Sequence, residues 1–405
     1  MGGGLLQLVA YGAQDVYLTG NPQITFFKVV YRRHTNFAIE AIQQTFNGNP
    51  GYGNRVTCQI SRNGDLIHRM YLTVDMSDET SEVCPYFGLR LIDYVELEIG
   101  GQKIDKQYSH WMYIWNELSL PYSKREGYKK MVGGDGDVLS GTSNDQLYIP
   151  LEFWFCRNVG LALPLIALQY HEVKVNILFQ TAEKCQGSTT PLDSPLGASS
   201  LWVDYIFLDT DERRRFAQLS HEYLIEQLQF TGTESLSGTQ AKPKLSFNHP
   251  CKELFWFVTA TGGTSPADNL NWNNFTNDQS ANLTTSMKER SATTSVNPIA
   301  SAKLVLNGND RFSERNGSYF NTIQPYQHHE NVPTNAGINV YSFALKPEEH
   351  QPSGTLNMSR IDTAVLNLNL NASYTANLEK SLHVYAVNYN VLRILSGMGG
   401  LAYSN

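Results

Sequence analysis

Short apolar runs separated by polar, glycine-containing segments recur along most of the chain. Two of these runs, residues 202–208 and 223–230, flank a charged segment half way along the sequence. Runs of this length that are rich in Val, Ile, Tyr and Phe are typical of β-strands. In the charged segment Thr210 is a candidate N-cap, and Asp211 and Glu212 would follow in a first helical turn, where the helix dipole favours acids. The pattern therefore predicts strand, short surface helix, strand.

The same pattern predicts a strand-rich fold in both halves. Asn63-Gly64, Gly100-Gly101 and Asn307-Gly308 each separate two apolar runs, which predicts hairpins because such turns need residues that tolerate positive φ. One helix is expected at 110–120. Long polar loops are expected at 121–146, 181–200 and 260–298. The predicted strands are residues 24–31, 55–61, 66–76, 91–99, 102–106, 147–155, 171–179 and 201–208, then 223–230, 244–247, 252–259, 303–306, 340–345, 364–370 and 382–394.

Three sequence landmarks occur in the same order in both halves, which predicts a tandem duplication. Residues 95–105 (VELEIGGQKID) parallel residues 302–312 (AKLVLNGNDRF), each a strand, a Gly-containing turn and a polar return. Residues 160–164 parallel 342–347, and residues 202–210 parallel 384–394. A repeated unit of about 185 residues with about eight strands suits a jelly roll, in which two sheets pack face to face.

The composition indicates ordered domains, and it does not predict a basic surface that could bind nucleic acid. The 405 residues are 41% hydrophobic and 11% aromatic, which is enough to build two cores. Only 17% are charged, and 38 acids against 31 bases give a net charge of −7. The basic clusters are small, so direct binding to nucleic acid is not expected. The low charge density indicates that much of the surface faces other protein or consists of long loops.

The cysteines and the first residues indicate a reducing compartment. The five cysteines are widely spaced and form no C-x-x-C pair, so buried free thiols are expected rather than disulfides or zinc ligands. They are Cys58, Cys84, Cys156, Cys185 and Cys251. The N-terminus has no basic n-region and is not a normal signal peptide. Glycines interrupt residues 1–23, but apolar anchors recur there, which predicts an arm that docks on the same or a neighbouring subunit.

No motif indicates a catalytic, cofactor or metal site. His328-His329-Glu330 is the densest histidine cluster, but adjacent residues on a strand point to opposite faces, so a polar loop is expected rather than metal ligation. Residues 397–402 match the residue spacing of a dinucleotide-binding fingerprint but not the structural context that it needs. That chemistry needs a helix after the glycines and only residues 403–405 follow, so a closely packed glycine-rich tail is expected. No nucleophile stands with a base, and neither an enzyme nor a cofactor is predicted.

Five N-x-[ST] sequons start at Asn274, Asn282, Asn316, Asn357 and Asn371. Asn274 and Asn282 lie in the predicted polar loop, where they would be accessible, and are the candidate glycosylation sites. Residues 269–277 (NLNWNNFTN) leave an alternative open, a jelly-roll carbohydrate-binding or host-attachment module that uses Trp272. A second alternative, a jelly-roll enzyme of cupin type, would need a histidine-rich metal motif that the sequence lacks.

Four long uninterrupted blocks carry a family resemblance. They are residues 7–37, 160–175, 202–232 and 388–403, the last reading NYNVLRILSGMGGLAY. They resemble the major capsid proteins of large icosahedral double-stranded DNA viruses, of phycodnavirus and iridovirus type, and most of all the algal-virus members. The family has no catalytic residues to carry over.

The resemblance implies an all-β double jelly roll, that is, two tandem eight-stranded antiparallel β-sandwiches with long loops and a few short helices. It also implies a homotrimer of pseudo-hexagonal outline, a capsomer that tiles the outer shell of the virion. Its implied partners are neighbouring capsomers, minor capsid proteins and an internal membrane near its inner face, without direct contact to nucleic acid. Free thiols fit assembly in the host cytoplasm.

Pattern and resemblance together predict four segments. An N-terminal arm spans residues 1–23 and the first jelly roll 24–210. A short connector follows at 211–222, and the second jelly roll spans 223–405. If the connector is rigid, it fixes the angle between the jelly rolls, on which a pseudo-hexagonal trimer depends.

Overall fold

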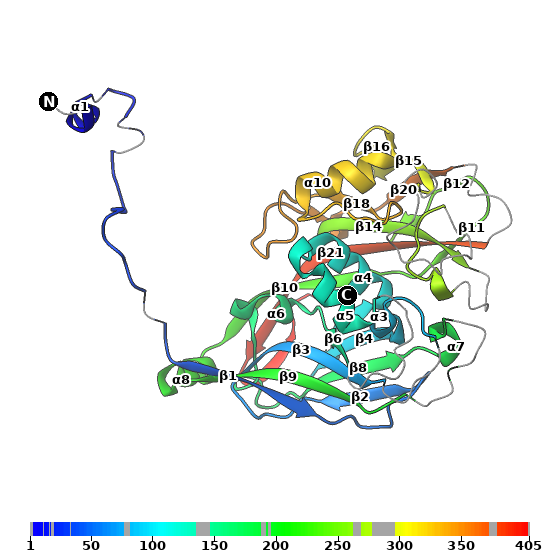
Figure 1. Ribbon diagram of the computed structural model, residues 1–405, viewed down its shortest axis with the longest axis horizontal. Coiled ribbons are helices and arrows are strands. Elements are labelled where there is room, and N and C mark those ends of the chain that lie inside the picture. Colours follow the sequence, from blue (N-terminus) through cyan, green and yellow to red (C-terminus); the bar gives the residue numbers. More distant parts are fainter. Residues whose placement is uncertain are drawn as a thin grey trace. The chain divides into compact units, whose positions relative to one another are not determined.

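The chain forms two compact units, Met1–Asn36 and Phe37–Asn405. The computed structural model describes residues 3–10, 12–15, 17, 20–32, 34–76, 82–134, 146–187, 192, 196–261, 269–277, 296–371 and 379–403. In the smaller unit, α1 (Gly3–Val9) leads into extended chain (Figure 1). The strand predicted at 24–31 is wrong, since the described part of this unit contains no strand and Phe26 and Phe27 are 95% exposed. A β-branched run forms a strand only where a partner satisfies its backbone.

The first half of the larger unit contains two antiparallel sheets (Figure 1). One has the order β1-β9-β3-β6 with β7 paired to β3, and the other has the order β2-β8-β4-β5. The strands are β1 (Phe37–Gln44), β2 (Arg55–Gln59), β3 (Leu66–Asp75), β4 (Ile92–Ile99), β5 (Gln102–Tyr108), β6 (Gln146–Pro150), β7 (Leu163–Pro164), β8 (Val173–Phe179) and β9 (Ser199–Leu208).

The second half also contains two antiparallel sheets. Their main orders are β10-β21-β14-β18 and β12-β20-β15-β16; β11, β19 and β22 join the first sheet, and β13 and β17 join the second. The strands are β10 (His221–Phe230), β11 (Glu234–Leu236), β12 (Gln240–Ala241), β13 (Lys244–Leu245), β14 (Pro250–Thr261), β15 (Ile299–Leu306), β16 (Asn309–Asp310), β17 (Arg315–Asn316), β18 (Asn339–Ser342), β19 (Leu356–Asn357), β20 (Ala364–Leu370), β21 (Glu379–Leu395) and β22 (Met398–Leu401).

Both halves have the same topology. When the eight main strands of each half are numbered in chain order, both halves pair them as 1-8-3-6 and 2-7-4-5. This is the strand order of a jelly roll, so the predicted double jelly roll is confirmed. The predicted duplication also agrees with it, because residues 202–210 and 384–394 fall on the eighth strands, β9 and β21. The two Gly-containing landmarks span the fourth and fifth strands of each half.

The helices lie mainly in the connections. The helix predicted at 110–120 is confirmed as α4 (Ser109–Ser119), but the loop predicted at 121–146 contains α5 (Tyr122–Val132). Its polar composition suggested a loop, yet Lys, Arg and Glu are good helix formers, and Gly133 ends the helix at φ 71°. No helix in the described ranges is long and apolar enough to span a membrane. The others are α3 (Phe87–Leu91), α6 (Trp154–Arg157), α7 (Ala182–Cys185), α8 (Thr210–Gln218), α10 (Gln324–His328), η1 (Val159–Leu161), the π-helix η3 (Tyr319–Ile323) and η4 (Met358–Arg360).

Two of the three predicted hairpins are confirmed. Gly100-Gly101 joins β4 to β5, and Asn307-Gly308 joins β15 to β16, in both cases with positive φ at the two turn residues. The hairpin at Asn63-Gly64 is wrong, because β2 and β3 belong to different sheets. Gly64 serves a close approach instead, since a Cβ there would lie 2.9 Å from the Cβ of Tyr205.

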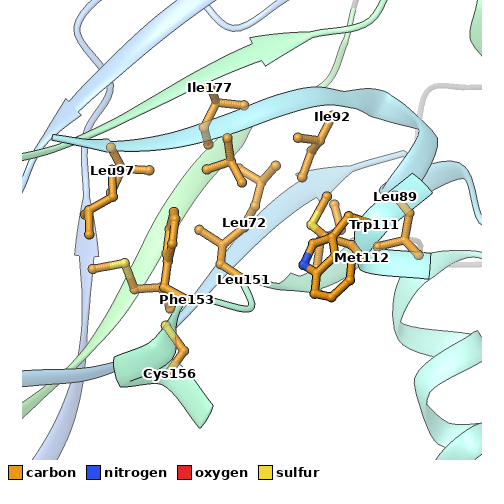
Figure 2. Packing of buried hydrophobic residues seen from close by; sticks show 14 of the residues in the cluster. Leu72, Leu89, Ile92, Leu97, Trp111, Met112, Leu151, Phe153, Cys156 and Ile177 are labelled. Carbon is orange, nitrogen blue, oxygen red and sulfur yellow. The ribbon is translucent and has the colours of Figure 1, made fainter. Parts of the chain in front are cut away.

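Each jelly roll encloses its own apolar core. In the first, Leu97 and Ile177 on one sheet face Leu72 on the other, and all three are fully buried (Figure 2). Burying a side chain of this size stabilises the fold by about 2 kcal/mol. In the second, Leu254 and Trp256 of β14 lie in a separate cluster.

The hairpin turn at Gly100 and Gly101 gives a matched test of backbone strain against packing. Gly101→Ala meets no neighbouring atom and should lose only about 1–2 kcal/mol for the left-handed backbone. Gly100→Ala would also displace the ring of His171, whose Nδ1 lies 2.8 Å from the Gly399 carbonyl oxygen, and should lose about 1–3 kcal/mol more. Chemical unfolding of both variants measures the difference. Equal losses would contradict the packing contribution.

Candidate functional site

The two jelly rolls meet along one face of the sheet that contains β14. Leu254 and Trp256 of β14 point into the second core, while Phe255 and Phe257 point the opposite way and join the cluster of the first jelly roll. All four are buried. Antiparallel sheets commonly leave one face to solvent, so a sheet covered on both faces marks a large internal interface. We call this interface, formed by α4, β10, β14, β21 and residues 269–277, the seam.

Helix α4 of the first jelly roll covers the second face of that sheet. The ring centroid of Trp111 lies 5.1 Å from that of Phe255 and 6.3 Å from that of Tyr385. Tyr385 also stacks on Phe230 of β10 at 4.6 Å. Aromatic pairs contribute about 0.5–1.5 kcal/mol each beyond the area they bury. The interleaved rings therefore hold α4 in one position on the sheet.

Residues 269–277 insert into the seam. Trp272 is 5% exposed and Phe275 is fully buried. The Trp272 indole Nε1 donates to the Pro85 carbonyl oxygen at 2.6 Å. The backbone carbonyl oxygen of Trp272 lies 3.2 Å from Nε2 of His110. The carbohydrate-binding alternative is therefore wrong for Trp272, because its ring faces protein. The polar residues around Trp272 predicted a surface loop, but its partners Pro85 and His110 lie in the other jelly roll.

The candidate glycosylation sites lie in or beside this segment. Asn274 is 1% exposed, and its Oδ1 accepts from the Thr276 amide at 3.1 Å and hydroxyl at 2.8 Å. The expected accessibility of Asn274 is therefore wrong, since the side chain is buried and engaged in a local turn. Asn282 lies outside the described residues.

A buried carboxylate links the two jelly rolls. Glu226 of β10 pairs with Arg157 of the first jelly roll at 3.0 Å and with Lys252 of β14 at 2.8 Å. Burial alone would raise the pKa of Glu226. The Arg157 guanidinium and hydrogen bonds from His350 and Lys252 outweigh burial and lower the pKa to about 2. The ion cluster is charged at neutral pH and spans the seam.

Asp105 makes a second polar link across the seam. Its Oδ1 accepts from the Leu228 amide of β10 at 3.0 Å, and its Oδ2 accepts from Gln107 at 2.9 Å. Gln227 of β10 also donates to the Ile104 carbonyl oxygen. Burial raises the pKa of Asp105, and the hydrogen bonds from the Leu228 amide and from Gln107 offset the rise only in part. Asp105 of β5 thus satisfies a backbone amide of β10, which belongs to the other jelly roll, and Gln227 of β10 satisfies a backbone carbonyl of β5.

The connector is anchored to the first jelly roll. Helix α8 is capped by Asp209, whose Oδ1 accepts from the Thr210 amide at 2.7 Å, so the predicted cap at Thr210 is one residue late. Arg213 donates to Oδ1 of Asp65 at 2.8 Å, and Oδ2 of Asp65 accepts from the Leu208 amide at 2.9 Å. These bonds hold the arginine-rich helix beside the end of β9.

The histidine cluster is divided between different partners. Nδ1 of His328 lies 3.0 Å from the Leu345 carbonyl oxygen. His329 is buried between Glu253 at 3.1 Å and Glu348 at 2.8 Å. Burial disfavours the charged ring, but the carboxylate of Glu253 and then that of Glu348 raise the pKa of His329 to about 9. Across the described ranges no three His, Cys, Asp or Glu side chains are grouped to hold a metal ion.

The cysteines are buried free thiols, as predicted. Burial raises the pKa of the Cys58 and Cys84 thiols to about 12, so both remain protonated and unreactive at neutral pH. The five thiols belong to the apolar cores.

Two family models match the two halves of the chain. Residues 25–209 match the model described as major capsid protein N-terminus, and residues 212–400 match the large eukaryotic DNA virus major capsid protein. The chain belongs to this family of viral major capsid proteins. The major capsid protein of Pyramimonas orientalis virus is 54% identical, and that of Paramecium bursaria Chlorella virus 1 is 48% identical, each over 100% of both chains.

Solved structures agree with the family. The chain in the quasi-atomic model of the PBCV-1 virus capsid has a TM-score of 0.80 at 42% identity, covering 94% of this chain and 100% of that one. The Faustovirus major capsid protein, at 13% identity, has a TM-score of 0.76 over 95% and 94% of the two chains, which shows that the fold is shared. The protein is a structural component of a virion and is not an enzyme.

The seam carboxylate predicts acid sensitivity. Because the folded pKa of Glu226 is about 2 and its ordinary value is 4.5, its stabilisation is complete above pH 4.5 and is lost as the pH falls toward 2. Glu226→Gln should cost about 3–5 kcal/mol at neutral pH, since it leaves the buried Lys252 and the partly buried Arg157 without their counter-ion. Glu222→Gln on the same strand removes an exposed pair with Arg393 and should cost less than about 1 kcal/mol. Urea unfolding at pH 7 and pH 3 measures both, and similar costs for the two variants would contradict the seam cluster.

Adjacent histidines give a second matched pair. With a folded pKa of about 9 against an ordinary 6.5, the stabilisation from His329 is complete below pH 6.5 and is lost as the pH rises through 9. His329→Gln should remove this alkaline loss and lower stability at pH 6 by about 3 kcal/mol or more. His328→Gln removes only a surface hydrogen bond and should preserve the wild-type pH profile. Thermal melts between pH 6 and 10 test this, and an unchanged profile for His329→Gln is the contradicting result.

Proposed function

We propose that this capsid protein assembles as a homotrimer of pseudo-hexagonal outline, a capsomer that tiles the outer shell of the virion. The observation that carries the proposal is the β10-β21-β14-β18 sheet buried on both faces, because it fixes two jelly rolls of one topology in a single arrangement. Three such chains supply six similar domains, which suits a six-sided outline. The PBCV-1 relative is itself described as part of a virus capsid.

The proposed partners are neighbouring capsomers and minor capsid proteins, with an internal membrane beneath the inner face. The N-terminal arm, residues 1–23, and the extended chain after it would bind another subunit or protein in the shell. The support is that Phe26, Phe27 and Tyr31 are each at least 89% exposed, which is costly in water for an isolated chain. Assembly in the host cytoplasm is proposed because the five cysteines are unpaired thiols.

Solution mass tests the trimer. Light scattering coupled to size exclusion should give about three times the 45.5 kDa of one chain, at micromolar concentration and neutral pH. The two-faced burial of the seam predicts that each subunit stays a rigid body on assembly, so the trimer should melt in one cooperative transition. A stable monomer over that concentration range would overturn the proposed function.

A further inference from the structure

The seam shows how one jelly roll of this chain binds another. Phe255 on β14 and Tyr385 on β21 are direct cross-strand partners, and both rings contact Trp111 of α4. The third and eighth strands of the second jelly roll thus present an aromatic pair. The helical connection between the fifth and sixth strands of the first jelly roll covers it.

The first jelly roll carries the same aromatic pair on its corresponding strands. Tyr71 on β3 and Trp202 on β9 are also direct cross-strand partners, and their rings stack in parallel at 6.3 Å. Both remain partly exposed, and Tyr148 of β6, 6.1 Å from Tyr71, is 40% exposed. The pair that is buried in the second jelly roll is therefore open at the surface of the first.

An open cavity of about 800 Å³ lies beside this exposed pair. We call it the groove. Tyr71, Tyr148 and Asp204 line its sheet side, and Leu120 and Met131 line the opposite side. The groove is mainly apolar with a few charged groups at its margin, which is the composition of a protein-binding pocket.

The second jelly roll also has a helical connection between its fifth and sixth strands, formed by η3 and α10. It is the counterpart of α4. In Figure 1 it lies on the side of β14 and β21 that faces away from the first jelly roll, whereas α4 lies between the two jelly rolls. Phe320 of this connection is buried, but two of its other apolar side chains face outward, with Tyr326 78% and Ile323 42% exposed. Leu345, 72% exposed, lies beside it through the bond between its carbonyl oxygen and His328.

We propose that the η3–α10 connection of one subunit, centred on Tyr326, docks in the groove beside Tyr71 and Trp202 of the next subunit. This contact repeats between chains the contact that α4 makes within a chain. Each subunit then has one donor surface and one acceptor surface, so the interface is head-to-tail, and in the proposed trimer three such contacts close a ring. The inference rests on the proposed trimer and names the surfaces that form it.

Surface variants with matched controls test the docking. Tyr326→Asp on the donor side, and Tyr148→Asp or Trp202→Asp on the acceptor side, should each raise the concentration at which the trimer dissociates by about thirtyfold or more, the effect of losing an interface hot spot. Thermal melts of the Tyr326 and Tyr148 variants as monomers should still show a cooperatively folded chain, because these two side chains are exposed. Tyr326→Phe keeps the ring and should remain trimeric. So should Tyr170→Asp, which changes a 75% exposed tyrosine outside both surfaces.

A mixing experiment tests the head-to-tail geometry. Tyr326→Asp retains an intact groove and Tyr148→Asp retains an intact donor surface, so equal amounts of the two variants should form dimers that cannot close. Sedimentation should show about twice the 45.5 kDa chain mass for the mixture and single chains for each variant alone. A mixture that stays monomeric, or that forms trimers, would overturn the head-to-tail pairing.

The two proposals fail in distinguishable ways. If the wild type is trimeric and Tyr326→Asp dissociates no more readily than Tyr170→Asp, the docking is wrong while the trimer stands. If only the groove variants dissociate, another segment occupies the groove, such as the exposed residues 24–31 of a neighbouring copy, and the assignment of Tyr326 is overturned. A monomeric wild type refutes the trimer itself, and the docking with it.

Discussion

The arrangement of this molecule depends on one strand whose alternate side chains belong to two different cores. In β14, Leu254 and Trp256 pack inside the second jelly roll, and Phe255 and Phe257 pack against the first. Because successive side chains of a strand point to opposite faces, a rotation of one jelly roll on the other would withdraw Phe255 from Trp111 without any change within either core. The angle between the domains is therefore set by side-chain packing over a sheet, and the connector only has to be compatible with it.

Buried charges at the seam restrict this arrangement further. Glu226 and Lys252 lie on two strands of the second jelly roll, whereas Arg157 belongs to the first, so a shift of the jelly rolls would separate Arg157 from the buried Glu226 carboxylate. Buried ion pairs add little net stability over apolar groups of the same size, but breaking one is costly. The aromatic rings thus supply most of the attraction, while the charged cluster and Asp105 penalise alternative positions. A capsid subunit needs this combination, because small errors of angle would add up around a closed shell.

Local features were predictable from sequence, and contacts between distant segments were not. Gly100-Gly101 and Asn307-Gly308 form hairpins because the turn residues and the paired strands are neighbours in the chain. Asn63-Gly64 carries the same local signal but joins two sheets, and Gly64 is there because Tyr205 packs on it. Likewise, polar neighbours hid the burial of Trp272, whose partners His110 and Pro85 lie in the other jelly roll. One usable signal was missed: LFWFV in β14 is a continuous apolar run, which is typical of a strand buried on both faces.

The duplication explains why one chain contains both a closed and an open version of the same surface. The two jelly rolls share strand order and the aromatic pair on their third and eighth strands, yet the intervening helices have diverged. Helix α4 has eleven residues and buries Trp111 within the chain, whereas α10 has five and exposes Tyr326. A head-to-tail interface of this kind closes into a ring only if each subunit is rotated relative to the previous one by a fixed angle. On the proposed trimer, the packing of β14 that orders one subunit therefore also decides whether three of them can close.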